Sequence, residues 1–459
     1  MSTECKSKTF QFQAINRRKI VGRFDGGRIT SDGGGLLLRE TARRTGLLTD
    51  LAQCFWDARD GRFIDHSVEQ LVSQRVYGLA LGYEDLNDHD ELRNDELLGV
   101  LVEKSDPGQK LAGKSTLNRV ELTTDGKDCY KKVVVDEEAV EQFLVRMYLK
   151  SRRRAPKKII LDLDATDDPL HGQQEGRFYH GYYRNYCYLP LYIFTGDGYP
   201  VWAQLRRSNI DASEGAVEAV EKIVTQIRQC WPEVEIWLRA DSGFAREELM
   251  AWCEANQVDY VFGLAKNSRL AAEIEDALEE AHQQYQESGK PARLFREFSY
   301  ATLKTWSRER RVIGKAEHLA KGRNPRFIVT SLSARQSPAR ALYEQIYCAR
   351  GEMENRIKEQ QLDLFADRTS SHRMKANQLR LWFSTAAYLL LHQLRRLGLK
   401  GTAMARAQCQ TIRLKLLKIG AQIRISVRRV LISLASGYPY ERIFAQVYSN
   451  LQRAGPVLD

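Results

Sequence analysis

The residues that point most directly to chemistry are acids at the carboxyl ends of two predicted strands. The run 159–166 (IILDLDAT) carries Asp162 and Asp164, and the run 234–241 (VEIWLRAD) ends on Asp241. Functional groups of open α/β sheets gather outside the carboxyl ends of strands. If the two strands are parallel neighbours, Asp164 and Asp241 lie side by side, and a divalent cation is the natural bridge between them. A single Asp at a strand end is more commonly a turn former, so the prediction depends on the pair.

A third acid lies far along the chain, on a predicted helix. Tyr347, Arg350 and Glu354 are spaced i, i+3 and i+7, which places them on one side of a helix, and Lys358 lies one turn beyond. Glu354 on that face would close a cage of three carboxylates around two cations. Spacing alone favours an ordinary salt-bridged helix, because neighbouring residues are also charged.

The elements that must position these acids follow an α/β pattern. Strand-like runs occur at 159–166, 186–195, 201–207, 234–241 and 258–264, with amphipathic helices at 212–230 and 247–256. The order strand, strand, strand, helix, strand, helix, strand predicts a mixed sheet with helices packed on it. A basic, proline-containing stretch at 151–158 is typical of a linker ahead of this core.

The flanking segments have a different character. Residues from about 30 to 150 predict helices, which fit a small DNA-binding domain and a structural subdomain equally well. From about 265 to 330 a charged helix precedes alternating aromatic, β-branched and charged residues, which predict an antiparallel β insertion. Two more helices are expected at 343–363 and 373–397.

The charge of the chain is uneven. The net charge is +11, yet the residues after Arg368 carry fifteen Lys and Arg against only Glu441 and Asp459. All of the excess positive charge therefore belongs to the last fifth of the chain. Nucleic-acid phosphates or an anionic membrane surface would explain this asymmetry, and a solvated basic face is the third reading. Phosphate contact is favoured.

Composition limits the class of protein. The chain has 459 residues, of which 43% are hydrophobic, so it can build sizeable cores. Eight cysteines show no C-x-x-C pair, which favours reduced thiols over a disulfide framework or a zinc site. The polar N-terminus and the absence of a long apolar run predict a cytoplasmic protein with no membrane association.

Three motifs together resemble the DDE transposases of bacterial insertion sequences. They are Asp164-Ala-Thr, the run 239–244 (RADSGF) and the spacing Tyr347-x2-Arg350-x3-Glu354. Supporting stretches are 167–174 (DDPLHGQQ), 181–183 (GYY), 258–265 (VDYVFGLA) and 350–359 (RGEMENRIKE). The chain is most similar to insertion-sequence family 1380, which has a Tyr-Arg-Glu-Lys-type signature. The resemblance runs from about residue 20 to 435.

The resemblance implies an RNase H-like catalytic core interrupted by a β-rich insertion. The order of strands and helices predicted from the residue patterns agrees with that core. We expect a mainly helical N-terminal region (1–150), a first part of the core (155–265), the insertion (266–335), completion of the core with the helix of Glu354 (336–400), and a basic helical C-terminal region (401–459). The N-terminal region is the candidate for recognising the DNA ends.

The resemblance also implies roles for residues. Asp164, Asp241 and Glu354 would be the catalytic residues and the ligands of Mg²⁺ or Mn²⁺, with two ions expected. Tyr347 and Arg350 would contact the DNA end. Further candidate DNA contacts are Lys358, Gln361, Trp306, Arg373 and Lys375.

One position departs from the family signature. Its Lys lies seven residues after the Glu, and here that position is Gln361. Lys358, one helical turn from Glu354, is the candidate to replace it. Some relatives stack a flipped base on a Trp of the insertion, and Trp306 is the corresponding candidate; a core or sheet-surface aromatic is the plainer reading.

The expected function is cut-and-paste transposition. The protein would bind the terminal inverted repeats of its element and the target DNA as a homodimer, in the cytoplasm and associated with the nucleoid. The alternatives are a metal-dependent nuclease or resolvase on the same fold, which cuts without joining, and a catalytically impaired DNA-end-binding protein. A membrane-surface protein is a weaker third reading.

Overall fold

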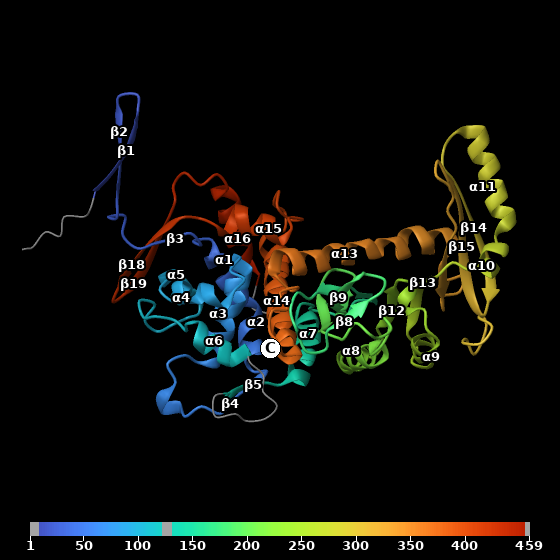
Figure 1. The fold of residues 1–459 in the computed structure, drawn as a ribbon, viewed down its shortest axis with the longest axis horizontal. Coiled ribbons are helices and arrows are strands. Elements are labelled where there is room, and N and C mark those ends of the chain that lie inside the picture. The colour runs from blue at the N-terminus through green and yellow to red at the C-terminus, as the bar shows by residue number, and fades with distance from the viewer. Residues whose placement is uncertain (1–8, 122–130, 455–459) are drawn as a thin grey trace, which may run out of the picture. The chain divides into compact units, whose positions relative to one another are not determined.

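The computed structural model describes residues 9–121 and 131–454. These residues divide into two compact units. Unit 1 takes its described residues from 9–53, 57–120 and 393–454, and unit 2 from 54–56, 121 and 131–392. Each unit is coloured along the chain in Figure 1. The expected N-terminal and C-terminal regions extend beyond the described residues at 1–8, 122–130 and 455–459.

Unit 2 is built on one mixed sheet. Its strands follow the order β11-β10-β6-β12-β13-β17-β15-β14, and β16 pairs with β15. The strand β6 is parallel to β12 and β12 is parallel to β13, whereas β10 is antiparallel to both β6 and β11. The bounds of the first five are β6 Lys158–Ala165, β10 Leu191–Thr195, β11 Pro200–Gln204, β12 Glu235–Ala240 and β13 Asp259–Leu264.

The expected β insertion continues the main sheet. After the helices α10 (Ser268–Ala272) and α11 (Glu275–Ser288), the chain forms β14 (Ala292–Tyr300), β15 (Arg310–Leu319), β16 (Gly322–Arg323) and β17 (Arg326–Thr330). Strand β17 pairs antiparallel with β13, so the inserted strands share one hydrogen-bonded sheet with the strands that carry the acids. A small separate sheet is formed by β7 (Asp168–Pro169), β9 (Asn185–Tyr188) and β8 (Phe178–His180).

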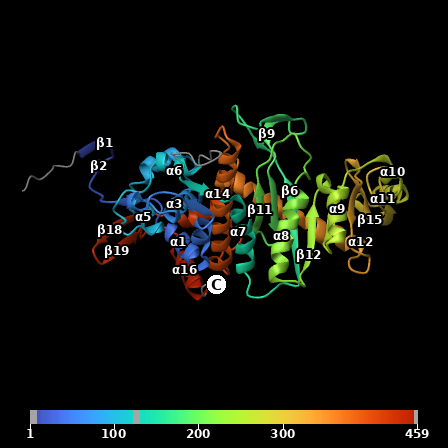
Figure 2. The ribbon, with the colours of Figure 1, turned by 90° about the horizontal axis from the view of Figure 1, so that it is seen from below.

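Helices cover both faces of the main sheet. The helices α7 (Glu137–Lys150), α8 (Ala216–Cys230) and α9 (Glu247–Ala255) follow one another, and Figures 1 and 2 show α8 and α9 on the face opposite α13. The buried side of α8 carries Val220, Ile223 and Ile227 at helical spacing, which is why this segment is amphipathic. Strands covered on both faces are apolar almost throughout, as β12 and β13 are.

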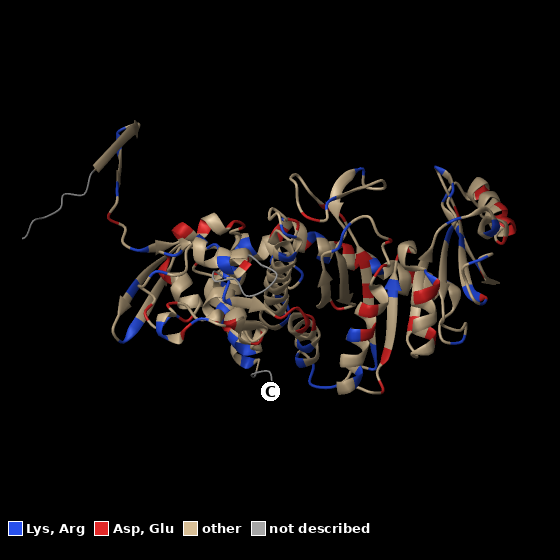
Figure 3. Cartoon of the chain, turned by 60° about the horizontal axis from the view of Figure 1, so that its bottom comes forward, with Lys and Arg blue, Asp and Glu red and all other residues tan. Residues whose placement is uncertain are grey.

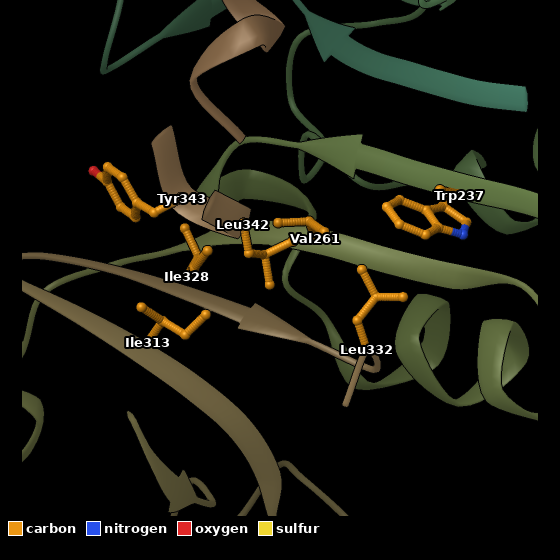
Figure 4. Close-up of a cluster of buried hydrophobic side chains, with 7 residues drawn as sticks. All are labelled: Trp237, Val261, Ile313, Ile328, Leu332, Leu342 and Tyr343. Atoms are coloured by element: carbon orange, nitrogen blue, oxygen red, sulfur yellow. The ribbon is translucent and has the colours of Figure 1, made fainter. Parts of the chain in front are cut away.

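The helical segment 339–363 crosses the sheet and is irregular. It runs from α12 (Ala339–Ala341) through a π-helical turn (Leu342–Tyr347) and a 3₁₀ turn (Cys348–Arg350) into α13 (Gly351–Lys358), and ends in a second π-helical turn (Glu359–Asp363). Its first turn is held by a buried cluster to which the core and inserted strands both contribute (Figure 4). The cluster comprises Trp237, Val261, Ile313, Ile328, Leu332, Leu342 and Tyr343. The helix α14 (Met374–Gln393) follows.

Unit 1 combines N-terminal helices with the end of the chain. Its helices include α1 (Gly35–Thr45), α2 (Leu47–Ala52), α3 (Val68–Leu81), α4 (His89–Leu92), α5 (Glu96–Leu101), α6 (Lys114–Glu121), α15 (Cys409–Ile412) and α16 (Glu441–Arg453). Its strands are β1 (Thr9–Ile15) paired with β2 (Arg18–Arg23), and β3 (Ile29–Thr30) paired with the hairpin of β18 (Ala421–Ser426) and β19 (Arg429–Leu434). The short strands β4 (Phe55–Asp57) and β5 (Val133–Val135) pair with each other and, apart from Asp57, belong to unit 2.

The C-terminal region differs from the helical tail expected. It contains the β18–β19 hairpin, and it supplies buried side chains to unit 1, among them Leu416, Leu417 and Leu451. The glycines at 33–35 explain the close fit, because a Cβ on Gly34 would meet the Leu416 carbonyl oxygen and Leu417 backbone. The amides of Gly33 and Gly34 donate to the carbonyls of Ile419 and Leu417. The tail is therefore an integral part of a folded unit.

The expected boundary at residue 150 also differs from the structure, because α7 packs on β11 and belongs to unit 2. Across residues 9–121 and 131–454, the longest apolar helices fall short of what a membrane crossing requires.

Candidate active site

Asp164 and Asp241 lie at the same edge of the sheet. Strands β6 and β12 are parallel neighbours, with Leu163 paired to Ala240. Asp164 is the second-last residue of β6, and Asp241 directly follows β12. The parallel pairing that the sequence predicts is thus present. Both aspartates line a pocket of about 510 Å³, and Glu354 lines the same pocket from α13. The structure therefore brings the three predicted acids into one cavity.

Asp162 takes no part in this pocket. It is 2% exposed and forms a bidentate ion pair with Arg239, in which Nη2 donates to Oδ2 at 2.7 Å. The Nη1 of Arg239 donates to the Ile346 carbonyl at 2.6 Å. Arg239 therefore ties the first strand to the helical segment that carries the third acid. A buried pair that is fully hydrogen-bonded fixes geometry, which is its value here.

Arg350 lies among the three acids. Its Nη2 donates to Glu354 Oε1 at 3.1 Å, and its Nη1 lies 3.7 Å from Asp164 Oδ2. The side chain of Arg350 is 16% exposed, whereas Glu354 is 49% exposed. Arg350 is the last residue of the 3₁₀ turn that follows the π-helical turn, and such irregularities recur at functional sites.

The pocket holds an excess of negative charge. Burial raises the pKa of Asp164 to about 7, with smaller contributions from the charges of Asp241 and Glu354, while Arg350 and the hydrogen bond from the Ala165 amide act in the opposite direction. Burial beside two other carboxyl groups therefore disfavours the charged form of Asp164. A second cation in the pocket would favour its charged form.

Asp241 is held by the turn that follows it. Its Oδ1 accepts the Gly243 amide at 2.8 Å, so the residue also has the capping role that a lone strand-end Asp commonly has. On the neighbouring strand, a Cβ on Gly263 would lie 2.6 Å from the Tyr347 hydroxyl and 2.9 Å from the Ser242 nitrogen. The glycine lets Tyr347 and the Asp241 turn approach the strand closely. Burial raises the pKa of Tyr347, which stays protonated.

The position that departs from the signature makes a structural contact. Gln361 lines the pocket, and its Nε2 donates to Asp168 Oδ1 at 2.8 Å and to the Asp167 carbonyl at 3.2 Å. Asp168 is fully buried, and burial raises its pKa to about 8. Lys358, the candidate to replace the missing Lys, is exposed at the rim of the pocket.

Tyr347 is not among the residues that line the pocket, and neither are the other three candidates, Trp306, Arg373 and Lys375. Trp306 packs edge-on against Tyr300 at 5.9 Å between ring centroids, and the Arg310 guanidinium lies 5.4 Å from its ring. This is the sheet-surface environment of the plainer reading. Arg373 and Lys375 are exposed at the start of α14.

Two residues of this site have no role in the sequence-based prediction. Arg239 and Asp168 both fall inside the motifs quoted above, which is the only signal that could have singled them out. Their contacts are to residues more than 75 positions away in the chain, so local patterns carry no trace of them.

The residues fit a divalent cation, although no preformed cage exists. Among the described residues, no three His, Cys, Asp or Glu side chains stand close enough together to hold a metal ion as they are. Carboxylate oxygens are nevertheless the ligands that Mg²⁺ and Mn²⁺ prefer. The pocket holds three such carboxylates, Asp164, Asp241 and Glu354, so the donor set suits such an ion.

Comparison with known proteins identifies the family. The family model described as transposase DDE domain group 1 matches residues 12–456. The chain therefore belongs to this transposase family.

A cryo-EM structure of a piggyBac transposase synaptic complex with hairpin DNA is 11% identical, covers 94% of this chain and 86% of its own, and gives a TM-score of 0.42. No curated protein matches.

Proposed function

We propose that this protein catalyses metal-dependent cleavage of DNA at the ends of a mobile element and joins the ends to target DNA. The observation that carries the proposal is the meeting of Asp164, Asp241 and Glu354 in one pocket, in a chain of a DDE transposase family. The first five strands, in the order β11-β10-β6-β12-β13 with β10 reversed, support an RNase H-like core. The likeness to insertion-sequence family 1380 belongs to the same proposal.

The three carboxylates would hold two ions of Mg²⁺ or Mn²⁺ at the carboxyl ends of β6 and β12. When bound, such ions activate a water or a 3′-hydroxyl and stabilise the leaving oxygen of the phosphate. Asp164 must lose its proton to act as a ligand, and the neighbouring positive charge of Arg350 lowers the pKa that burial raises.

Other side chains of the site position the DNA strand. Arg350, once its Glu354 contact is exchanged for a phosphate, supplies a bidentate contact to the backbone. Tyr347 would pack beside the strand end, and Lys358 adds a positive charge at the rim. The β18–β19 hairpin and the helices of unit 1 would supply phosphate contacts along the duplex. A second copy of the chain would hold the other DNA end.

The test uses duplexes copied from the DNA on both sides of the coding region, incubated with Mg²⁺. The wild-type protein should nick these ends and join precleaved ends to a plasmid. Asp164→Asn, Asp241→Asn and Glu354→Gln should lower both rates at least a thousandfold while changing the Kd for the DNA no more than about threefold, because electrostatic stabilisation of the reacting phosphate is lost. Asp276→Asn on α11 is the matched control and should retain wild-type rates.

Normal cleavage by any of the three variants would remove that residue from the site. Cleavage without joining would establish a nuclease in place of a transposase. Binding of the ends without either reaction would indicate an end-binding protein that has lost catalysis.

A further inference from the structure

An unusually exposed group of aromatic side chains lies beside the proposed active site. The hairpin of β8 and β9, here called the aromatic hairpin (residues 177–188), presents Phe178, Tyr179, Tyr182 and Tyr186 with exposed fractions of 37%, 57%, 84% and 43%. Figure 2 shows β9 projecting past the end of the main sheet. Large aromatic side chains of this kind are typically buried for most of their area, so four exposed within nine residues indicate a binding surface.

The aromatic hairpin is anchored next to Asp164. The Tyr183 hydroxyl donates to the carbonyl of Ala165, the residue after Asp164, at 3.3 Å. Strand β9 also pairs with β7, which begins at the buried Asp168. His180, Tyr182 and Tyr183 line the same pocket as the three acids. The exposed rings are thus fixed at the rim of the proposed reaction centre.

The charge of the aromatic hairpin suits a polyanion. No Asp or Glu occurs between residues 176 and 196, whereas Arg177 and Arg184 lie within the hairpin. The Arg177 guanidinium stacks on the Tyr186 ring at 3.8 Å, and Arg184 is exposed beside Tyr182 in the connecting loop. Flat rings interleaved with arginines are the surface that binds unpaired nucleotides, whose bases stack and whose phosphates pair with guanidinium groups.

We propose that the aromatic hairpin binds an unpaired nucleotide of the DNA strand that enters the pocket, with its base stacked on Tyr182. This inference rests on the proposed function and names a substrate feature of that site. A duplex shields the faces of its bases, so a fully paired DNA offers nothing for an 84% exposed ring to stack on. Opening one or two base pairs beside the reacting phosphate would give Tyr182 a partner and hold the strand in place.

The inference assigns stacking to a different element from the one the sequence suggested. Trp306 is packed against Tyr300 and Arg310 and lies outside the pocket lining. Tyr182 is 84% exposed, and among the described residues its one ring contact is an edge-on approach to Tyr183, with 5.0 Å between ring centroids. Substitutions of Tyr182 and of Trp306 can therefore show which of the two side chains stacks on the base.

The experiment compares two duplexes copied from the DNA beside the coding region. One is fully paired and the other carries two unpaired nucleotides at the cleaved end, one of them 2-aminopurine. The wild-type protein should bind the second duplex about tenfold more tightly and quench the 2-aminopurine fluorescence. Tyr182→Ala should lose both the preference and the quenching, and Tyr182→Phe should retain both because the ring is kept. Trp306→Ala is the comparison variant and should behave as wild type.

Equal affinity of the wild-type protein for both duplexes, without quenching, would overturn the inference. So would a loss of preference in Trp306→Ala but not in Tyr182→Ala, or an equal loss for both duplexes in Tyr182→Ala. These outcomes are distinct from failure of the proposed function, which would appear as absent cleavage by the wild type or unchanged cleavage by Asp241→Asn.

Discussion

At the scale of single residues, the site is defined by how its acids are partnered. Asp162 and Asp164 are two positions apart on one strand, yet one is neutralised by Arg239 and the other opens into a pocket with two further carboxylates. Burial raises the pKa of both groups, and Asp162 has the stronger compensation because its hydrogen bonds with Arg239 are short and complete. Only Asp164 is left to interact with a ligand.

Asp168 provides a residue-scale prediction about pH. Its pKa is about 8 in the folded protein, compared with 3.8 as the ordinary value, because the group is buried. The folded state therefore keeps a proton that the unfolded state releases, and Asp168 lowers the stability progressively as pH rises from about 4 to 8. Asp168→Asn should flatten this decline, since the amide cannot ionise and can still pair with Gln361. The Tm of the wild type and of Asp168→Asn, followed between pH 5 and 8.5, measures this decline in stability.

The control for that experiment is Asp276→Asn, which removes an exposed carboxyl group on α11. Its profile of Tm against pH should keep the wild-type slope over the same range. An equally steep decline in Asp168→Asn would show that the group is not the source of the pH dependence.

At the scale of elements, close approach between β13 and the Asp241 turn is required for the site. A Cβ at Gly263 would overlap the Ser242 nitrogen and the Tyr347 hydroxyl. Gly263→Ala should therefore cost about 1–3 kcal/mol of stability and lower DNA cleavage about a hundredfold, because the Asp241 turn is displaced. Thermal unfolding and a cleavage assay on the same preparation measure the two effects.

Gly196→Ala is the matched control, because the nearest atom to its Cβ, on Ile160, would lie at an ordinary 3.4 Å. It should leave both stability and cleavage close to wild type. Wild-type cleavage by Gly263→Ala would show that the approach of the turn to β13 does not matter for the reaction.

The elements also show how far the sequence could predict the fold. The strands β6, β12 and β13 are evident as continuous apolar runs because they are covered on both faces. The run 186–195 is read as a single strand, but the structure breaks it into β9 and β10, which belong to different sheets. Pro190, which cannot donate a ladder hydrogen bond, stands at that break.

Local residue patterns cannot predict which strands pair when the strands lie far apart in the chain. The inserted strands have the alternation of an antiparallel sheet, yet nothing in that alternation says that β17 pairs with β13. The β18–β19 hairpin is likewise hidden, because its Ile and Leu residues continue a pattern that also suits a helix. For the site, strand ends indicated Asp164 and Asp241, and the family resemblance added Glu354. These two signals could not predict Arg350 among the acids or the Asp168–Gln361 contact.

At the scale of the whole molecule, positive charge is presented by a folded hairpin. Arg424 on β18, Arg428 in the turn and Arg429 on β19 are exposed, and Figure 3 marks basic residues there and acidic residues along α11. Deleting residues 401–459 would remove buried parts of unit 1, so truncation is no clean test of charge. Point substitutions on the hairpin are the better probe.

We expect the triple variant Arg424→Gln, Arg428→Gln, Arg429→Gln to weaken DNA binding and to reduce the slope of log Kd against log salt by about 2 to 3, since each phosphate contact contributes about 0.9. The matched control replaces Lys290, Lys304 and Lys321, three exposed cations of the inserted region, by Gln and should keep the wild-type slope. Fluorescence anisotropy between 50 and 300 mM salt, roughly the range over which such slopes are read, measures both. An unchanged slope in the hairpin variant would place the phosphate contacts elsewhere.

The central claim is that Asp164, Asp241 and Glu354 share a divalent cation. It is tested most directly by titrating the DNA-bound protein with Mn²⁺ and following free Mn²⁺ by electron paramagnetic resonance. The wild type and Asp276→Asn should bind the ion with the same affinity, whereas Asp241→Asn should weaken binding at least tenfold. Equal Mn²⁺ affinity in the wild type and Asp241→Asn would contradict the account.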